Sequence, residues 1–206
     1  MRRYTPLLAV AGAILCLGAL VSTATARTFS VTSQTWRATY RALETRWGES
    51  EASRCALTLE GSFHARTMTK SAGSLIGYVT RAVLEACASG SATVLQSTLP
   101  WHIQYASFTG ILTARITSIR ANVINAGIGV REPIGFPCLF RSTAIEPLAL
   151  IFNTFIGPLV ITAAELSGEF SRPAECPASR ASVRVSAAST SITVLNSVTL
   201  ISVRLI

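Results

Sequence analysis

Aspartate is absent from this chain of 206 residues, lysine occurs once and histidine twice. The lack of aspartate excludes a Ser-His-Asp triad, an aspartic dyad and Asp-rich calcium loops, so glutamate is the only acidic side chain. Glycine-rich phosphate loops, a Walker motif, an EF-hand and an H-E-x-x-H motif are also missing. No motif in the sequence therefore indicates a particular reaction, and we expect no cofactor.

The first 26 residues have the pattern of an export signal. Two arginines start it, an uncharged apolar run follows from Leu7 to Val21, and a small-x-small cleavage pattern ends at Ala26. The apolar run is shorter than the roughly 20 residues that span a bilayer. We therefore expect cleavage after Ala26, no stable membrane span afterwards, and a single secreted or envelope-associated domain over residues 27–206.

Four cysteines remain outside the expected signal, namely Cys55, Cys87, Cys138 and Cys176. In an oxidising compartment they predict two disulfides, with three possible connectivities. The order that needs only local closures is Cys55–Cys87 and Cys138–Cys176, each stabilising the fold by about 3–4 kcal/mol on the loop-entropy model. A structural zinc site is the alternative, but the cysteines lack the C-x-x-C spacing that such sites use.

Alternation of apolar and polar residues is the dominant pattern, and it predicts half-buried β-strands. From Cys55 to Arg66, one face carries Leu57, Leu59 and Phe63. From Leu95 to Tyr105, one face carries Trp101 and Ile103 with Tyr105, and Pro100 predicts an edge position or a bulge. Further strands are expected at residues 111–119, 121–130, 148–152, 159–164, 181–187 and 191–206.

Turn chemistry separates these segments at residues 88–90, 107–110, 131–133, 153–158 and 171–173. Many short strands between such turns predict an all-β fold, an antiparallel sandwich or barrel with room for one short helix. Residues 34–47 and 74–86 fit both helical and strand spacing. We favour a strand for the first of these segments and leave the second open.

The only candidate catalytic or metal-binding residues are Glu60, His64 and His102. Glu60 and His64 share the polar face of one predicted strand, and His102 lies on the polar face of another. If those strands paired in register, two imidazoles and a carboxylate could bind zinc. Alternatively, Ser62, His64 and Glu60 of the one strand could form a hydrolytic set. Neighbours on one strand face lie roughly 7 Å apart, too far for a direct Ser–His hydrogen bond, so a solvated outer face is favoured over both.

The chain carries a formal net charge of +8, and its basic residues are scattered along the sequence. Nucleic-acid binding would favour a concentrated basic stripe with interleaved aromatics, so we expect no nucleic-acid partner. A dispersed basic surface is more typical of weak association with anionic envelope polymers.

Three runs resemble a group of small exported β-rich proteins of high-GC actinobacteria, which has no assigned function. They are Cys55–His64, Leu75–Ala82 and Leu99–Tyr105. The resemblance implies an exported β-rich fold and transfers no catalytic residue. We therefore expect a non-enzymatic binding or structural module of the cell envelope or extracellular space. A secreted hydrolase or metal-binding enzyme that uses Glu60, His64 and His102 is the alternative.

Overall fold

The computed structural model describes residues 28–48, 50–110, 116–131, 137–155, 160–171, 176, 180–185 and 192–206, so the expected export signal lies outside the described residues. Within these ranges the chain forms strands and one short 3-10 helix. In chain order the elements are β1 (Thr28–Val31), β2 (Thr35–Trp47), β3 (Ser50–Phe63), β4 (Thr67–Thr69), β5 (Leu75–Ser89), β6 (Ser91–Val94), η1 (Gln96–Thr98), β7 (Trp101–Gly110), β8 (Ile116–Ile124), β9 (Gly127–Arg131), β10 (Pro137–Arg141), β11 (Leu148–Phe155), β12 (Val160–Ser171), β13 (Arg180–Val185), β14 (Ile192–Thr193) and β15 (Val203–Leu205).

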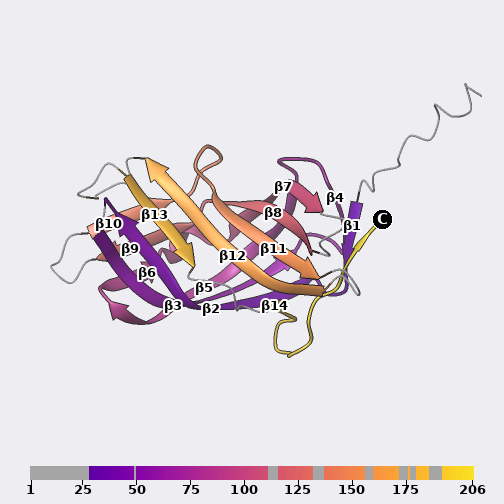
Figure 1. Ribbon diagram of the computed structural model, residues 1–206, viewed down its shortest axis with the longest axis horizontal. Coiled ribbons are helices and arrows are strands. Elements are labelled where there is room, and N and C mark those ends of the chain that lie inside the picture. Colours follow the sequence, from indigo (N-terminus) through magenta and orange to yellow (C-terminus); the bar gives the residue numbers. More distant parts are fainter. Residues whose placement is uncertain are drawn as a thin grey trace, which may run out of the picture.

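Strands β2, β3, β5, β7, β8, β11, β12 and β13 close into an antiparallel barrel (Figure 1). The last of them, β13, pairs with the first at Leu43–Trp47. The C-terminal segment completes this seam, because Ile192 of β14 pairs with Ala38 of β2 and the amide of Ile161 in β12 donates to the carbonyl of Ile201. Closure pairs the strand edges of the ring with one another. The expected all-β sandwich or barrel is thus a barrel.

Apolar side chains fill the barrel because every second residue of each strand points inward. Trp36, Phe63 and Phe152 form an aromatic cluster with ring centroids 6.0–6.5 Å apart. The predicted inward residues Leu57, Leu59 and Phe63 of β3, and Trp101, Ile103 and Tyr105 of β7, are all buried. Burial also raises the pKa of the Tyr40 hydroxyl, which stays protonated at neutral pH. The alternating pattern therefore identified the core face correctly.

Two three-stranded sheets lie toward the ends of the barrel, β15–β1–β4 at one end and β10–β9–β6 at the other (Figure 1). Both predicted disulfide pairs are confirmed. Cys55 of β3 joins Cys87 of β5 across a cross-strand pair, and Cys138 of β10 joins Cys176. The first disulfide thus links two barrel strands, and the second links the sheet β10–β9–β6 to the segment that follows β12.

The strand favoured for residues 34–47 is confirmed as β2, and residues 74–86, which the sequence leaves open, form strand β5. Other sequence expectations differ from the structure. The turn expected at residues 107–110 is wrong, since Phe108 lies in β7 and pairs with Ile119 of β8. Pro100 precedes β7 rather than interrupting it, and β7 lies between β5 and β8 rather than at an edge. Pairing of residues 107–110 with β8 outweighs the local turn preference of Ser, Thr and Gly.

Two asparagines explain why longer predicted strands are divided. Asn125 and Asn196 have positive φ angles of 66° and 60°, a conformation that asparagine tolerates better than most residues. The first separates β8 from β9, and the second turns the chain between β14 and β15. Residues 153–155, expected in a turn, continue β11, and the rest of that expected turn lies outside the described residues up to Val160. None of the described segments is a helix with the length and apolarity to cross a membrane.

Candidate functional site: an arginine-rich outer face

The two histidines do not meet at a shared site. Strand β5 lies between β3 and β7, and its Tyr78 separates the imidazoles. The Tyr78 ring centroid is 6.4 Å from that of His64 and 5.4 Å from that of His102, both in edge-on arrangements. The zinc hypothesis required the two histidine strands to be adjacent, and β5 lies between them instead.

Glu60 is instead the centre of an ion-pair row on the outer face of the barrel. One oxygen of its carboxylate accepts hydrogen bonds from Arg37 at 2.6 and 2.9 Å and from Arg81 at 3.0 Å. The three residues face one another on adjacent strands β2, β3 and β5. Among the described residues, no group of three or more His, Cys, Asp or Glu side chains is placed to hold a metal ion.

A second row has the same composition one strand further around the barrel. The Glu44 carboxylate on β2 accepts a hydrogen bond from Arg54 of β3 at 2.7 Å and from Arg184 of β13 at 3.3 Å. These hydrogen bonds, led by that from Arg54, hold the pKa of Glu44 below its ordinary value, although burial opposes them. Each row places two guanidinium groups around one carboxylate and therefore remains positively charged.

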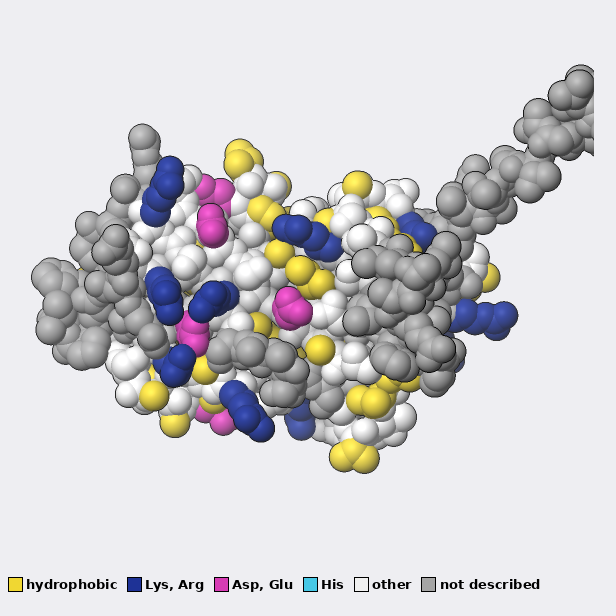
Figure 2. Space-filling view, in the orientation of Figure 1, with side chains coloured by type: hydrophobic (Ala, Val, Ile, Leu, Met, Phe, Trp, Pro, Cys, Tyr) yellow, Lys and Arg dark blue, Asp and Glu magenta, His cyan; other side chains and the backbone are white. Residues whose placement is uncertain are grey.

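Two adjoining surface pockets lie beside this second row, with volumes of about 530 and 490 Å³. They share Arg46, Glu169 and Ser182, so they form one continuous depression on the outside of β8, β11, β12, β13 and β2. Figure 2 shows dark blue arginine side chains gathered over the half of this view that carries β13 and β2, with acidic side chains between them. We call this depression the arginine groove, defined by Arg46, Arg120, Glu169, Arg180, Ser182 and Arg184.

Three arginines of the groove are exposed and make no ion pair with any described residue: Arg46, Arg120 and Arg180. Each stands on a barrel strand next to a buried residue (Thr45, Ile119 or Ala181), which fixes its backbone with the side chain on the outer face. The barrel strands thus present three cations that have no ionic partner among the described residues.

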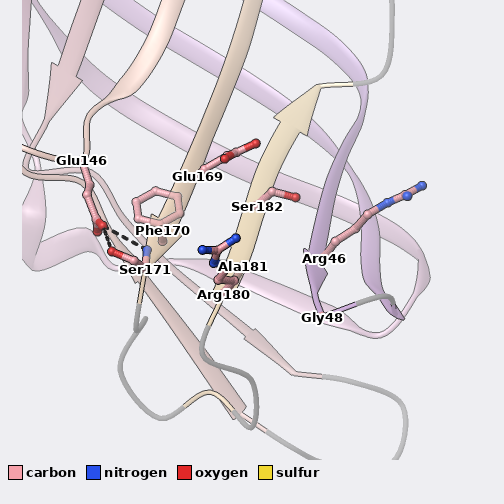
Figure 3. A pocket seen from close by; sticks show the side chains of 9 residues that line it. All are labelled: Arg46, Gly48, Glu146, Glu169, Phe170, Ser171, Arg180, Ala181 and Ser182. Atoms are coloured by element: carbon pink, nitrogen blue, oxygen red, sulfur yellow. Dashed lines mark hydrogen bonds between the residues drawn. The ribbon is translucent and has the colours of Figure 1, made fainter.

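One carboxylate at the end of the groove, that of Glu146, is hydrogen-bonded to a neighbouring residue of the protein. Glu146 accepts hydrogen bonds from the backbone amide of Ser171 at 3.0 Å and from its hydroxyl (Figure 3). These bonds lower the pKa of Glu146, which therefore stays ionised and bound to Ser171. Glu169, by contrast, lies in the middle of the groove opposite Ser182 of β13.

The arginine groove was not found from the sequence, where the basic residues look scattered. Arg46, Arg120 and Arg180 lie far apart in the chain and come together only through the pairing of β13 with β2 and of β11 with β8 and β12. The sequence feature that could have indicated it is the alternation of buried and exposed residues, because each of these arginines lies at an outward position of its strand.

Neither protein-family models, nor curated proteins, nor solved structures match this chain. The resemblance to exported actinobacterial proteins therefore stays a prediction, and functional conclusions depend on the groove itself.

Proposed function

We propose that this protein is an exported, non-enzymatic binding module of the cell envelope or extracellular space, and that its arginine groove binds anionic envelope polymers. The observation that carries the proposal is the set of three exposed arginines, Arg46, Arg120 and Arg180, which make no ion pair with any described residue and surround one continuous depression. Arginine is suited to this role because its planar guanidinium donates paired hydrogen bonds to carboxylate and phosphate groups.

Two further features support this role. Both disulfides suit an oxidising compartment outside the cytoplasm. The backbone of the outer face is also ordered before binding, since each groove arginine alternates with buried residues of a closed barrel, so a bound ligand orders arginine side chains but not the backbone. The hydrolase alternative needs Glu60, His64 and His102 together, and no observation on the described residues favours it.

Binding to polyanions of defined composition tests the proposal. Hyaluronate, polygalacturonate and long-chain inorganic polyphosphate serve as probes, and neutral dextran is the control polymer. We expect at least one polyanion to bind, with an affinity that falls as salt is raised, because exposed charges are screened by added ions. Dextran should not bind.

The decisive variant is Arg46→Gln/Arg120→Gln/Arg180→Gln. At about 0.2–1 kcal/mol for each exposed charge pair, it should weaken binding by about threefold to a hundredfold. The matched control is Arg66→Gln/Arg131→Gln/Arg204→Gln, which removes the same charge from exposed positions that do not line the groove. Equal losses in the two triple variants, or no polyanion binding at all, would contradict the proposal.

A further inference from the structure

The charges of the arginine groove are separated by polar groups in a regular order. Along the outer face of β13, Arg180, Ser182 and Arg184 occupy alternate positions. At about 3.3 Å per residue, the two arginine Cα atoms on this strand lie roughly 13 Å apart. Ser182 lies between them, so the strand presents a cation, a hydroxyl and a second cation in sequence.

The middle position is flanked by a carboxylate on one side and a cation on the other. Across the sheet, Ser182 is paired with Glu169 of β12 and with Arg46 of β2 (Figure 3). Glu169 lines both pockets and makes no ion pair with any described residue. An anionic group placed over Ser182 would lie between Arg46 and the Glu169 carboxylate, which offsets the attraction of Arg46. A neutral hydroxyl group there could instead donate a hydrogen bond to Glu169 and exchange hydrogen bonds with Ser182.

From this order we infer that the groove takes an acidic polysaccharide in which charged sugars alternate with neutral, hydroxyl-bearing sugars; the inference rests on the proposed function. Anionic groups of the polymer contact Arg180 and Arg184, the second of which is 58% exposed beside its ion pair with Glu44. The neutral sugar between them lies over Ser182 and Glu169. A polymer with a charge on every unit places one anion beside Glu169, whose like charge reduces what that anion gains from Arg46.

The test compares hyaluronate, which alternates charged and neutral sugars, with polygalacturonate and inorganic polyphosphate, which carry a charge on every unit. Dissociation constants are measured by calorimetry at physiological ionic strength and expressed per anionic group. We expect hyaluronate to bind the native protein more tightly than either other polymer. In Glu169→Gln, the preference should fall by about two- to fivefold, the effect of one exposed like-charge contact, chiefly through tighter binding of the fully charged polymers.

Glu85→Gln is the matched control, because Glu85 is exposed on β5 and lines neither pocket. It removes the same charge and should leave the preference unchanged. Thermal unfolding of both variants verifies that the barrel remains folded. The inference is overturned if polygalacturonate or polyphosphate binds the native protein as tightly as hyaluronate, or if Glu169→Gln leaves the preference unchanged. If either result occurs but polyanion binding still depends on Arg46, Arg120 and Arg180, the proposed function is retained and only this inference fails. If no polyanion binds at all, both the proposed function and this inference are refuted.

Discussion

Replacing Glu44 with glutamine tests whether the ion-pair rows stabilise the barrel. The Glu44 side chain is only 4% exposed, and its two partners, Arg54 and Arg184, are 49% and 58% exposed. Glutamine has nearly the same size and still accepts hydrogen bonds, so Glu44→Gln removes the negative charge with little change in packing. Both arginines keep access to water, and the variant should fold.

The expected loss of stability follows from the two hydrogen bonds to charged groups. Exposed ion pairs contribute about 0.2–1 kcal/mol each, and the buried carboxylate places these two toward the upper end of that range. We therefore expect Glu44→Gln to lower the free energy of unfolding by about 1–2 kcal/mol at pH 7. Glu85→Gln, at an exposed position, should change it by less than about 0.5 kcal/mol.

The pH dependence gives this prediction a definite sign. The arginines hold the pKa of Glu44 in the folded protein below its ordinary value of 4.5. A lowered folded-state pKa stabilises the protein above the pKa of the unfolded chain, and this stabilisation is lost as the pH falls through the folded-state value. Because glutamine does not titrate, the stability difference between native protein and variant should be complete at pH 7 and should shrink as the pH drops below 4.5.

Urea unfolding followed by tryptophan fluorescence measures this difference, since Trp36 and Trp101 are buried in the barrel and report its opening. Curves at pH 7, pH 5 and pH 3 are compared for the native protein, Glu44→Gln and Glu85→Gln. A stability difference that stays constant over this pH range would refute the reasoning, as would a Glu44→Gln variant as stable as the native protein at pH 7.

Two further predictions concern the packing and the cross-links of the barrel. Gly61→Ala should lower the free energy of unfolding by about 1–3 kcal/mol, because a β-carbon there would overlap the Trp36 ring and a backbone oxygen of β5. Gly129→Ala is the control, because a β-carbon there meets its nearest neighbour at a longer distance, and it should lower stability less in the same urea assay. Equal losses of stability in the two variants would argue against the close contact at Gly61. Replacing Cys55 and Cys87 with alanine opens a closure of 32 residues and should cost about 3–4 kcal/mol under oxidising conditions. A reductant should remove most of that difference, and its persistence in the reduced proteins would indicate a packing effect instead.

The strand faces and the disulfides could be predicted from the sequence because both depend on local information. Alternation identified Leu57, Leu59 and Phe63 as core residues, and short sequence separation favoured the observed cysteine pairs. The turn expected at residues 107–110 failed for the opposite reason. Those residues have turn preferences of their own, but β8 provides pairing partners whose positions no local pattern records.

The candidate site depended on strand order and register, which the sequence does not specify. His64 and His102 would have met only if β3 and β7 were neighbours, and the insertion of β5 between them placed Tyr78 there instead. Glu60 was recognised as an outward polar residue. Its burial between Arg37 and Arg81 follows from pairing on both sides of β3, which brings three separate segments into one row.

Arg46, Arg120 and Arg180 of the groove differ from the arginines of the two rows in how they are paired, and Arg184 belongs to both sets. In each row the carboxylate, Glu44 or Glu60, is directly opposite arginines on both neighbouring strands, and strand pairing alone fixes the ion pairs. In the groove the same sheet geometry sets Glu169 opposite Ser182, so the carboxylate and the nearby cations are offset from each other. Unpaired cations held close together on rigid strands repel one another, and anionic groups of a ligand relieve that repulsion. A surface selected only for stability would gain from the pairing seen in the rows, so the offset in the groove supports the proposed binding of an anionic partner.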